Sequence, residues 1–407
     1  MGCLTPQVLV VGGGMITRDQ ILPSLLQLQR LGRVAGISVC ASRAETVRRL
    51  GEAPEIRRAF PDQGFRVYPE SGGPHPDLYR ELLAGMPPRN LAVIALPDQL
   101  HHEAVMAALA CDQHVCVVKP LALKRSHAQE IAREQYRRGL LVGVEYHKRF
   151  DDRSLMARQR YRAGLFGEFR LGAACLLEKW YYRHSNFQTW MTADNSDAFT
   201  YIGCHYVDLV HFITGLLPRA VSLYGIRDRF PNGNEGYLWT DARVIWSNGA
   251  CLNVQNALGF ADAAPGANTQ GLVMYMSGRA SGAWLAHSDQ YRGLQYCYTR
   301  KGDEPGATMY AEPSPDYFQY LDLGGMGLVP AGYGFRSIEH IVEQAIRVEQ
   351  QPTLAARQKL LREIDAQGIL ATPANSAYNE AVIEAGRISI QERGKLVEIE
   401  TASTAPE

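Results

Sequence analysis

Residues 8–17 read Val-Leu-Val-Val-Gly-Gly-Gly-Met-Ile-Thr, an apolar run that leads directly into three glycines. This pattern is typical of the first strand of a dinucleotide-binding fold and of the turn that follows it. The first glycine would form the tight turn, and the third would let the backbone approach a pyrophosphate. The next residues would begin a helix whose positive end favours phosphate. The predicted cofactor contacts are Gly12, Gly14, Met15 and Ile16. An ordinary glycine turn is the plain alternative, because Thr17 stands where G-x-G-x-x-G has its third glycine.

The cofactor preference is suggested by the residues after the second predicted strand, which ends at Cys40. A site that prefers NAD usually offers an acidic residue there, for the ribose 2′-hydroxyl. This chain has Ser42 and Arg43 instead. Since a guanidinium pairs well with phosphate, the pair favours NADP over NAD. The alternative is that Arg43 is only a solvated residue at the start of a helix.

Short apolar segments alternate with helix-like segments over the first part of the chain. This alternation predicts a Rossmann domain over residues 1–147, with a doubly wound parallel sheet. The predicted strands are Val8–Val11, Ala35–Cys40, Phe65–Tyr68, Leu91–Leu96, His114–Val118 and Leu140–Glu145. The predicted helices include Ala44–Gly51, Asp77–Ala84, His101–Ala110 and Ser126–Arg138.

The pattern changes after Phe150, and residues 148–400 are predicted to form a second α/β domain. Helices are expected at Arg153–Ala163, Phe199–Thr214, Ser337–Glu349, Leu354–Ile364 and Ser376–Arg393. Strands are expected at Arg170–Leu177, Val221–Tyr224, Thr240–Trp246, Ala250–Asn256, Gly271–Met276, Gly282–His287 and Leu294–Thr299. Consecutive strands with Asn-Gly and Ser-Gly turns indicate a mostly antiparallel sheet. The tail after Thr401 is predicted to be disordered.

The bulk composition points to a small-molecule partner. The 407 residues include 42 basic and 42 acidic side chains, so the formal net charge is zero. The long-range attraction that brings proteins to nucleic acid or anionic membranes is therefore missing. No apolar run is long enough to span a membrane, and no export signal is visible. The 8 cysteines form no C-x-x-C pair, which favours buried thiols in a cytoplasmic protein.

Three further segments carry a family resemblance. They are Ala95-Leu-Pro-Asp-Gln-Leu-His101, His114-Val-Cys-Val-Val-Lys-Pro120 and Tyr201-Ile-Gly-Cys-His-Tyr-Val-Asp208. In order and spacing they resemble the T-P-N-x-x-H, E-K-P and D-x-G-x-H-x-x-D motifs of the glucose-fructose oxidoreductase / inositol dehydrogenase / MocA family. The resemblance implies a Rossmann domain followed by an α/β domain with a large, open, mainly antiparallel sheet. It also implies a dimer or tetramer formed through the outer face of that sheet.

The resemblance assigns the chemistry to a lysine and a histidine. Oxidation of a secondary alcohol needs a group that takes the hydroxyl proton and a cation near the oxygen. The resemblance gives these tasks to Lys119 and His205, with Asp208 orienting the imidazole or contacting the substrate. It also places Leu96, Pro97, His101, Lys119 and Pro120 around the nicotinamide. A metal site built from His205, Asp208 and His211 is a weaker alternative, because this spacing spreads the ligands around a helix.

The chain departs from the family motifs at three places. Val118 replaces the glutamate of E-K-P, and Leu96 and Asp98 replace the outer residues of T-P-N. Tyr201 replaces the aspartate four residues before the histidine, so a phenol would have to supply the missing hydroxyl contact.

Aromatic and polar side chains between residues 178 and 186 suit the apolar faces and hydroxyl edges of a sugar. The predicted substrate contacts are Lys119, His147, Trp180, Tyr182, Arg183, Tyr201 and His205, although a packed amphipathic loop would read the same way. The main hypothesis is an NAD(P)-dependent oxidoreductase of a sugar, cyclitol or glycoside, without metal. The alternatives are a redox-neutral glycosidase or lyase with a tightly held dinucleotide, and a non-catalytic dinucleotide sensor.

Overall fold

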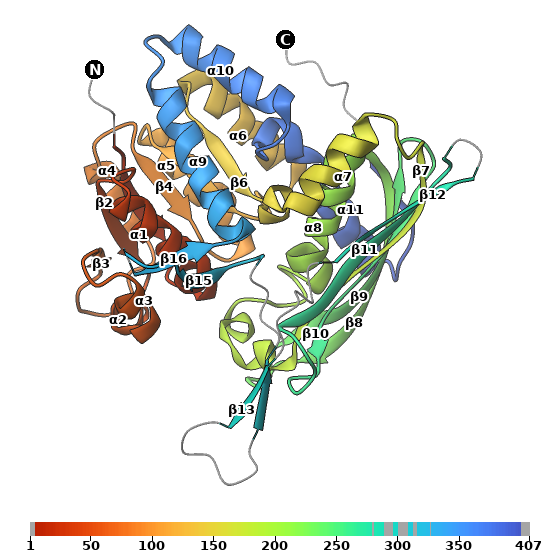
Figure 1. Ribbon diagram of the computed structural model, residues 1–407, viewed down its shortest axis with the longest axis horizontal. Helices are drawn as coiled ribbons and strands as arrows, with labels where there is room; N and C mark the ends of the chain where they lie inside the picture. Colours follow the sequence, from red (N-terminus) through yellow and green to blue (C-terminus); the bar gives the residue numbers. More distant parts are fainter. Residues whose placement is uncertain are drawn as a thin grey trace. The chain divides into compact units, whose positions relative to one another are not determined.

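The protein is described from a computed structural model that covers residues 5–278, 281–288, 296–299, 308–311, 316–325 and 327–399 (Figure 1). The start of the predicted strand Leu294–Thr299 and the predicted disordered tail lie outside these residues. The chain forms two compact units: residues 1–150 with 318–380, and residues 151–317 with 381–407. The predicted domains of 1–147 and 148–400 differ from these units, because residues 318–380 pack with the first unit.

Among its described residues, the first unit contains a six-stranded parallel sheet in the order β3-β2-β1-β4-β5-β6. The strands are β1 (Gln7–Val11), β2 (Gly36–Cys40), β3 (Arg66–Tyr68), β4 (Leu91–Ile94), β5 (His114–Val118) and β6 (Val142–Glu145). Every residue of β4 and β6 is buried, as expected for strands covered on both faces. The strand order reverses between β1 and β4, where a doubly wound sheet binds its ligand.

The helices of this unit cover the sheet. They are α1 (Leu22–Arg30), α2 (Ala44–Glu52), α3 (Pro54–Ala59), α4 (Leu78–Gly85), α5 (His101–Ala110), α6 (Arg125–Arg138), α9 (Tyr333–Glu349) and α10 (Leu354–Gln367). Shorter turns are η1 (Thr17–Ile21), η2 (Asp98–Leu100) and η3 (His147–Phe150). A hairpin of β15 (Gln319–Asp322) and β16 (Leu328–Ala331) precedes α9, which packs on β5 and β6 (Figure 1).

The second unit contains a seven-stranded sheet among its described residues, in the order β12-β11-β7-β10-β9-β8-β17. Its strands are β7 (Phe169–Lys179), β8 (Pro218–Arg229), β9 (Glu235–Trp246), β10 (Cys251–Phe260), β11 (Asn268–Met276), β12 (Ala283–His287) and β17 (Val397–Glu398). All neighbours are antiparallel except β7 and β10, which pair in parallel. The predicted fold class, a Rossmann domain plus a mainly antiparallel α/β domain, is confirmed.

The remaining elements of the second unit lie mostly along one face of the sheet (Figure 1). They are α7 (Asp152–Arg162), η4 (Trp180–His184), η5 (Asn186–Thr189), η6 (Phe199–Gly203), α8 (Cys204–Thr214) and the C-terminal part of α11 (Pro373–Gln391). A hairpin of β13 (Tyr296–Thr299) and β14 (Thr308–Ala311) forms a separate two-stranded sheet. Strand β9 alternates buried and accessible residues, so one sheet face is core and the other is open.

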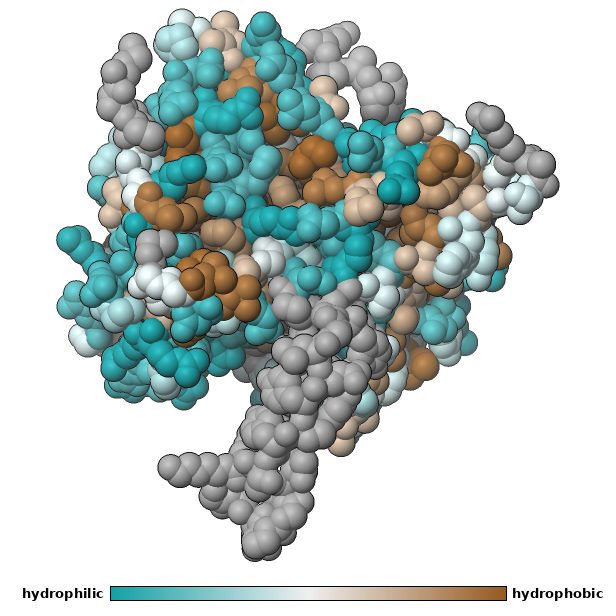
Figure 2. Space-filling model, in the orientation of Figure 1, coloured by the Kyte–Doolittle hydropathy of each residue, from teal (hydrophilic) through white to brown (hydrophobic). Residues whose placement is uncertain are grey.

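The surface shown in Figure 2 carries apolar residues in separate patches among hydrophilic ones. Within the described residues, no helix is both long enough and apolar enough to cross a membrane.

Candidate functional site

The glycine turn is fixed by contacts with three strands of the first unit. Gly12 has a φ of +114°, and a β-carbon built on it would lie 2.0 Å from the carbonyl oxygen of Ala95. The Gly12 amide donates to the Cys40 carbonyl at 2.7 Å. The Thr17 hydroxyl donates to the Gly12 carbonyl, also at 2.7 Å. Gly12 is therefore the point where the ends of β1, β2 and β4 meet, and only glycine fits there.

A helix begins at Met15, directly after the turn, and passes through the π-helical turn η1 into α1. The Arg18 amide reaches back to the Gly14 carbonyl at 3.1 Å. Amides in the first turn of a helix have no intrahelical acceptor, so those of Gly14, Met15 and Ile16 are suited to an anion. Together with the cradle at Gly12, this arrangement fits the pyrophosphate of a dinucleotide.

The residues predicted to choose between NAD and NADP follow β2 and are exposed. Ser42 uses its carbonyl oxygen to accept from the His75 amide at 2.7 Å, which fixes the backbone here. Arg43 stands at the N-cap of α2. The arginines of the same helix pair with Glu45, whereas Arg43 makes no such ion pair with any described residue. Its guanidinium is therefore available for an anionic group.

His101 has a different role from the cofactor contact predicted for it. The side chain is fully buried, with Nδ1 2.6 Å from the Pro120 carbonyl oxygen and Nε2 2.8 Å from the Leu96 carbonyl oxygen. The ring thus ties the loop after β4, which includes Pro97, to the loop after β5. His101 positions these two backbones, and its own side chain is closed to a ligand.

Lys119 is the first residue after β5, at the carboxyl end of the strand, and it is half-buried. It precedes Pro120 through a cis peptide bond. Ligands of such sheets bind at the carboxyl ends of the strands, so the amine stands at the expected edge.

A polar cluster around His147, a predicted substrate contact, lies at the end of the next strand, β6. The buried Glu145 carboxylate accepts from Gln20 at 2.8 Å and from the Ser337 hydroxyl at 2.6 Å. Its second oxygen lies 3.1 Å from Nδ1 of His147, whose ring stacks on Tyr333 with centroids 5.7 Å apart. His147 is therefore oriented by a carboxylate. For the partners of His147, the sequence signal is an acidic residue, Glu145, that ends an apolar strand.

In the second unit, the Gly-x-His motif lies on the helix formed by η6 and α8. A β-carbon on Gly203 would lie 2.5 Å from Oδ1 of Asn256, so the glycine lets the helix approach β10 closely. His205 and Asp208 are both buried, at 5% and 2% exposure. The predicted continuous helix is instead a π-helical turn followed by an α-helix, which changes the face that Tyr201 shares with the histidine.

The start of this helix is capped by a buried aspartate that the motif reading overlooked. Asp197 accepts from the amide and the hydroxyl of Thr200, each at 2.8 Å, and pairs with Arg387 at 3.3 Å. At the other end, Nδ1 of His211 lies 2.8 Å from the Leu216 carbonyl oxygen. His211 therefore closes the helix terminus, and the alternative of a metal site with His205 and Asp208 is not supported. No cluster of three metal-ligating side chains occurs in the part of the chain that is described.

The structure divides the predicted sugar-contacting residues into two groups. The Arg183 guanidinium lies over the Trp180 ring at 3.8 Å and over Trp239 at 5.3 Å. It also donates to the Leu258 carbonyl at 2.6 Å and to Asp228 at 2.5 Å. This ion pair lowers the pKa of Asp228. Arg183 is thus a buried structural residue that holds η4 on the sheet, contrary to its predicted role as a substrate contact, and Trp180 packs against it.

The second group joins Tyr182 to Tyr201 through one phenylalanine. Phe187 packs edge-to-face on Tyr182 at 5.8 Å and on Tyr201 at 4.8 Å between ring centroids. Burial is the main cause that raises the pKa of Tyr182, so its phenol is neutral. Tyr182 and Tyr201, both predicted to bind substrate, therefore pack on the same phenylalanine.

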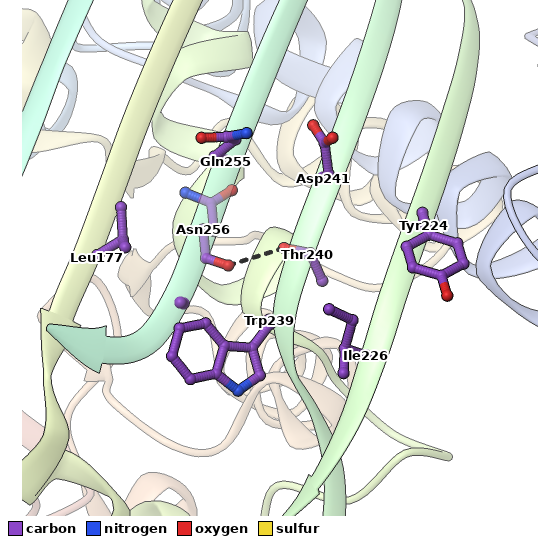
Figure 3. Close-up of a pocket in the computed structure, with 9 residues that line it drawn as sticks. Leu177, Tyr224, Ile226, Trp239, Thr240, Asp241, Gln255 and Asn256 are labelled. Atoms are coloured by element: carbon purple, nitrogen blue, oxygen red, sulfur yellow. Dashed lines mark hydrogen bonds between the residues drawn. The ribbon is translucent and has the colours of Figure 1, made fainter.

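A hollow of about 200 Å³ lies on the open face of the second sheet (Figure 3). Figure 3 shows the Trp239 ring between Leu177 and Ile226. The lining residues are Leu177, Tyr224, Ile226, Trp239, Thr240, Asp241, Gln255, Asn256 and Ala257. None of the predicted site residues lines this hollow, so we do not assign the chemistry to it.

Comparison with known proteins supports the dinucleotide assignment. Residues 7–146 match the family model GFO_IDH_MocA, described as an oxidoreductase family with an NAD-binding Rossmann fold. A search of curated proteins finds no match. The match confirms the predicted family and, at the level of the family, the predicted class of nicotinamide-dependent oxidoreductase.

Solved structures share the fold over almost the whole chain. GenD2 from gentamicin A biosynthesis, in complex with NAD, has a TM-score of 0.65 at 16% identity, over 98% of both chains. Myo-inositol 2-dehydrogenase from Lactobacillus plantarum has a TM-score of 0.64 at 16% identity, over 98% of this chain and 100% of the other. Scyllo-inositol dehydrogenase from Lactobacillus casei, with NAD(H) and scyllo-inositol, has a TM-score of 0.63 at 13% identity, over 97% of this chain and 99% of the other. Residues 7–146 are therefore similar to the Gfo/Idh/MocA family of oxidoreductases, which has an NAD-binding Rossmann fold.

Proposed function

We propose that this protein transfers a hydride between a nicotinamide dinucleotide and a secondary hydroxyl or ketone of a sugar, cyclitol or glycoside. The observation that carries the proposal is the turn at Gly12, at the carboxyl edge of the sheet. The glycine leaves no side chain there, and a helix begins directly after the turn. The family match over the same residues supports a dinucleotide there. A structure of the same fold that holds NAD(H) and scyllo-inositol supports a polyol substrate.

Lys119 is the residue that we propose moves the hydroxyl proton. When bound, the nicotinamide supplies or accepts the hydride. The Lys119 amine, at the end of β5, accepts the proton of the reacting hydroxyl and returns it in the reverse direction. Its protonated form also stabilises negative charge that develops on the oxygen. The His101 bridge keeps the backbone on both sides of this position fixed.

His205 is proposed to bind or protonate the same substrate oxygen, with Asp208 as its orienting partner one turn later on α8. Tyr201 and Tyr182 would supply phenolic hydroxyls in place of the aspartate of the family motif. His147, oriented by Glu145, is proposed as a further substrate contact. Trp180, which is 41% exposed, stays a proposed substrate contact, whereas Arg183 is left out because its buried guanidinium pairs with Asp228.

NADP is the proposed cofactor in preference to NAD. The exposed guanidinium of Arg43 follows β2 directly, beside Ser42, and no acidic side chain stands at either position. An arginine at this place can hold the 2′-phosphate.

The second candidate is a redox-neutral glycosidase or lyase that oxidises its substrate transiently and then reduces it again. The replacement of the motif aspartate by Tyr201 favours it, because the usual proton relay is altered. A non-catalytic sensor is the third candidate. Net change in nicotinamide absorbance separates the first candidate from the other two, and product analysis on glycosides separates the second from the third.

A homo-oligomer, in the cytoplasm, is proposed as the working state, with no nucleic-acid or membrane partner. The open face of the second sheet exposes large apolar side chains, among them Tyr224, Ile226, Tyr275 and Trp284, each more than half exposed. Apolar surface of this kind marks an interaction site. Sedimentation equilibrium should give a multiple of the 45.2 kDa chain mass, and a monomer at micromolar concentration would contradict the proposal.

The reaction itself is tested by titrating the protein with NADPH and NADH, followed by a panel of sugars, cyclitols and glycosides. Tight cofactor binding with reduction of the oxidised cofactor by one substrate class supports the proposal. Binding without net reduction on any substrate contradicts it.

A further inference from the structure

Five aromatic side chains of the second unit form a continuous surface that leads to Tyr201. We call Tyr181, Tyr182, Phe187, Trp190 and Tyr201 the aromatic wall. Tyr181 stacks on Tyr182 with centroids 4.6 Å apart, and Tyr182 meets Phe187 at 5.8 Å. Tyr201 meets Phe187 at 4.8 Å and Trp190 at 6.0 Å, in edge-to-face geometry. These separations are those of directly packed rings, so the wall is one unit.

One end of the aromatic wall lies close in sequence to the proposed catalytic histidine. Tyr201 lies in η6, and His205 lies four residues later in α8. The wall therefore ends one helical turn before the proposed catalytic histidine. Tyr201 also occupies the place of the motif aspartate, so an anionic hydrogen-bond acceptor is replaced by a packed ring at this point.

The wall is uncharged. Burial, and then the negative charge of Glu178, raise the pKa of the Tyr182 phenol, so it stays neutral. The carboxylate nearest in sequence to η6 is Asp197, which is fully buried and held by Thr200 and Arg387. The cations beside the wall in sequence have other partners, since Lys179 donates to the carbonyls of Ala261 and Asp262 and Arg183 pairs with Asp228.

Part of the wall is accessible to a ligand. Tyr181 is 51% exposed, and Tyr182, Trp190 and Tyr201 are half-buried, while Phe187 forms the buried backing at 3% exposure. An inositol carries a hydroxyl on every ring carbon and needs hydrogen-bonding partners around its edge. A surface made of several adjoining rings instead matches a planar apolar group, which gains both burial and ring packing.

From this placement we propose that the substrate is a glycoside with an aryl aglycone, whose sugar reacts beside His205 and whose aromatic ring packs on the wall. This inference rests on the proposed oxidoreductase function and narrows its substrate class.

The test compares phenyl and methyl glycosides of glucose, galactose, mannose and xylose, with cofactor reduction followed by absorbance in each case. For the sugar that reacts, kcat/KM for the phenyl glycoside should exceed that for the methyl glycoside by about five-fold or more. Equal kcat/KM values for the phenyl and methyl glycosides, or turnover of free cyclitols alone, would overturn the inference. Either result would leave the oxidoreductase function unaffected. Absence of reduction by any substrate would contradict the proposed function itself.

Variants test whether the aromatic wall causes the preference for phenyl over methyl glycosides. Tyr181→Ala and Trp190→Ala should each reduce the phenyl-to-methyl ratio of kcat/KM toward one. Leu165→Ala, which removes another exposed apolar side chain of the second unit, is the control and should keep the ratio. Because Trp190 is half-buried, circular dichroism is used to check that the Trp190→Ala variant is folded. If it is unfolded, Tyr181→Ala still tests the inference, because the Tyr181 side chain is exposed. An unchanged ratio in folded Tyr181→Ala and Trp190→Ala would remove the wall from substrate recognition.

Discussion

The α-carbon of Gly12 lies so close to Ala95 that a β-carbon would stand 2.0 Å from the Ala95 carbonyl oxygen. The neighbour is backbone at the end of β4, which cannot move aside as a flexible side chain would. The φ of +114° at Gly12 excludes other residues independently of this contact. Two separate constraints therefore hold this position as glycine, at the sheet edge where doubly wound folds bind their ligands.

Gly12→Ala should abolish cofactor binding and destabilise the first unit by about 3 kcal/mol, because β1 and β4 must separate. Fluorescence titration with NADPH and urea denaturation measure the two effects. Gly51→Ala is the matched control, since a β-carbon there meets nothing within 4 Å. It should bind NADPH like the wild type. Normal binding by Gly12→Ala would mean that the turn does not hold the pyrophosphate.

Arg43→Ala should weaken NADPH binding about ten-fold, because a charge-assisted hydrogen bond to the 2′-phosphate is lost. NADH has no such phosphate, so its affinity should stay the same. Arg58→Ala removes another exposed arginine of the first unit and should affect neither cofactor. Equal losses for NADPH and NADH in Arg43→Ala would overturn the proposed preference.

Lys119→Ala should reduce turnover about a hundred-fold or more, since the group that moves the proton is gone. Cofactor affinity should remain close to that of the wild type. The control is Lys124→Ala, an exposed lysine five residues later, which should retain wild-type turnover.

Adding His205→Gln to Lys119→Ala tests whether the two residues serve one step. The combined loss should then be much smaller than the product of the single losses. Full turnover in Lys119→Ala would remove the lysine from the mechanism.

Stability should depend on pH through Asp365, a half-buried residue of α10. Burial is the main cause that raises its pKa from 3.8 to about 6, against the hydrogen bond from Thr372. Because the folded state holds this proton more tightly, the stabilising contribution is complete below about pH 4 and is lost as pH rises through about 6. Asp365→Asn cannot ionise. The difference in the free energy of unfolding between Asp365→Asn and the wild type should therefore change with pH. From pH 4 to pH 7.5 it should shift by up to about 3 kcal/mol in favour of the variant.

Urea denaturation at several pH values measures this change. Ala366→Ser, at an exposed position of the same helix, changes no ionisable group and should show a difference from wild type that does not vary with pH. A pH-independent difference for Asp365→Asn would contradict the assignment.

The first unit was largely predictable because its signals are local. A strand buried on both faces is a continuous apolar run, and each such run in residues 8–145 became a strand. What the sequence could not predict is the return of residues 318–380 to this unit, since that packing depends on contacts between distant segments. Ser337, for example, reaches Glu145 across 192 positions.

The side-chain roles were less predictable than the elements. His101 matched a motif position, but the motif cannot tell a ring that touches the cofactor from a ring that bridges Leu96 and Pro120. Arg183 sits among aromatic residues in a pattern that suits a sugar site. Its actual partners, Trp239 and Asp228, lie on strands that no local pattern connects to it.

The most direct test of the account is to mix the protein with NADP⁺ or NAD⁺ and a panel of polyols and glycosides, and to record nicotinamide absorbance over a single turnover. The account predicts that reduced nicotinamide appears with at least one sugar-like substrate, and that Lys119→Ala binds the cofactor but does not reduce it. Tight cofactor binding with no reduction by any substrate would contradict the account.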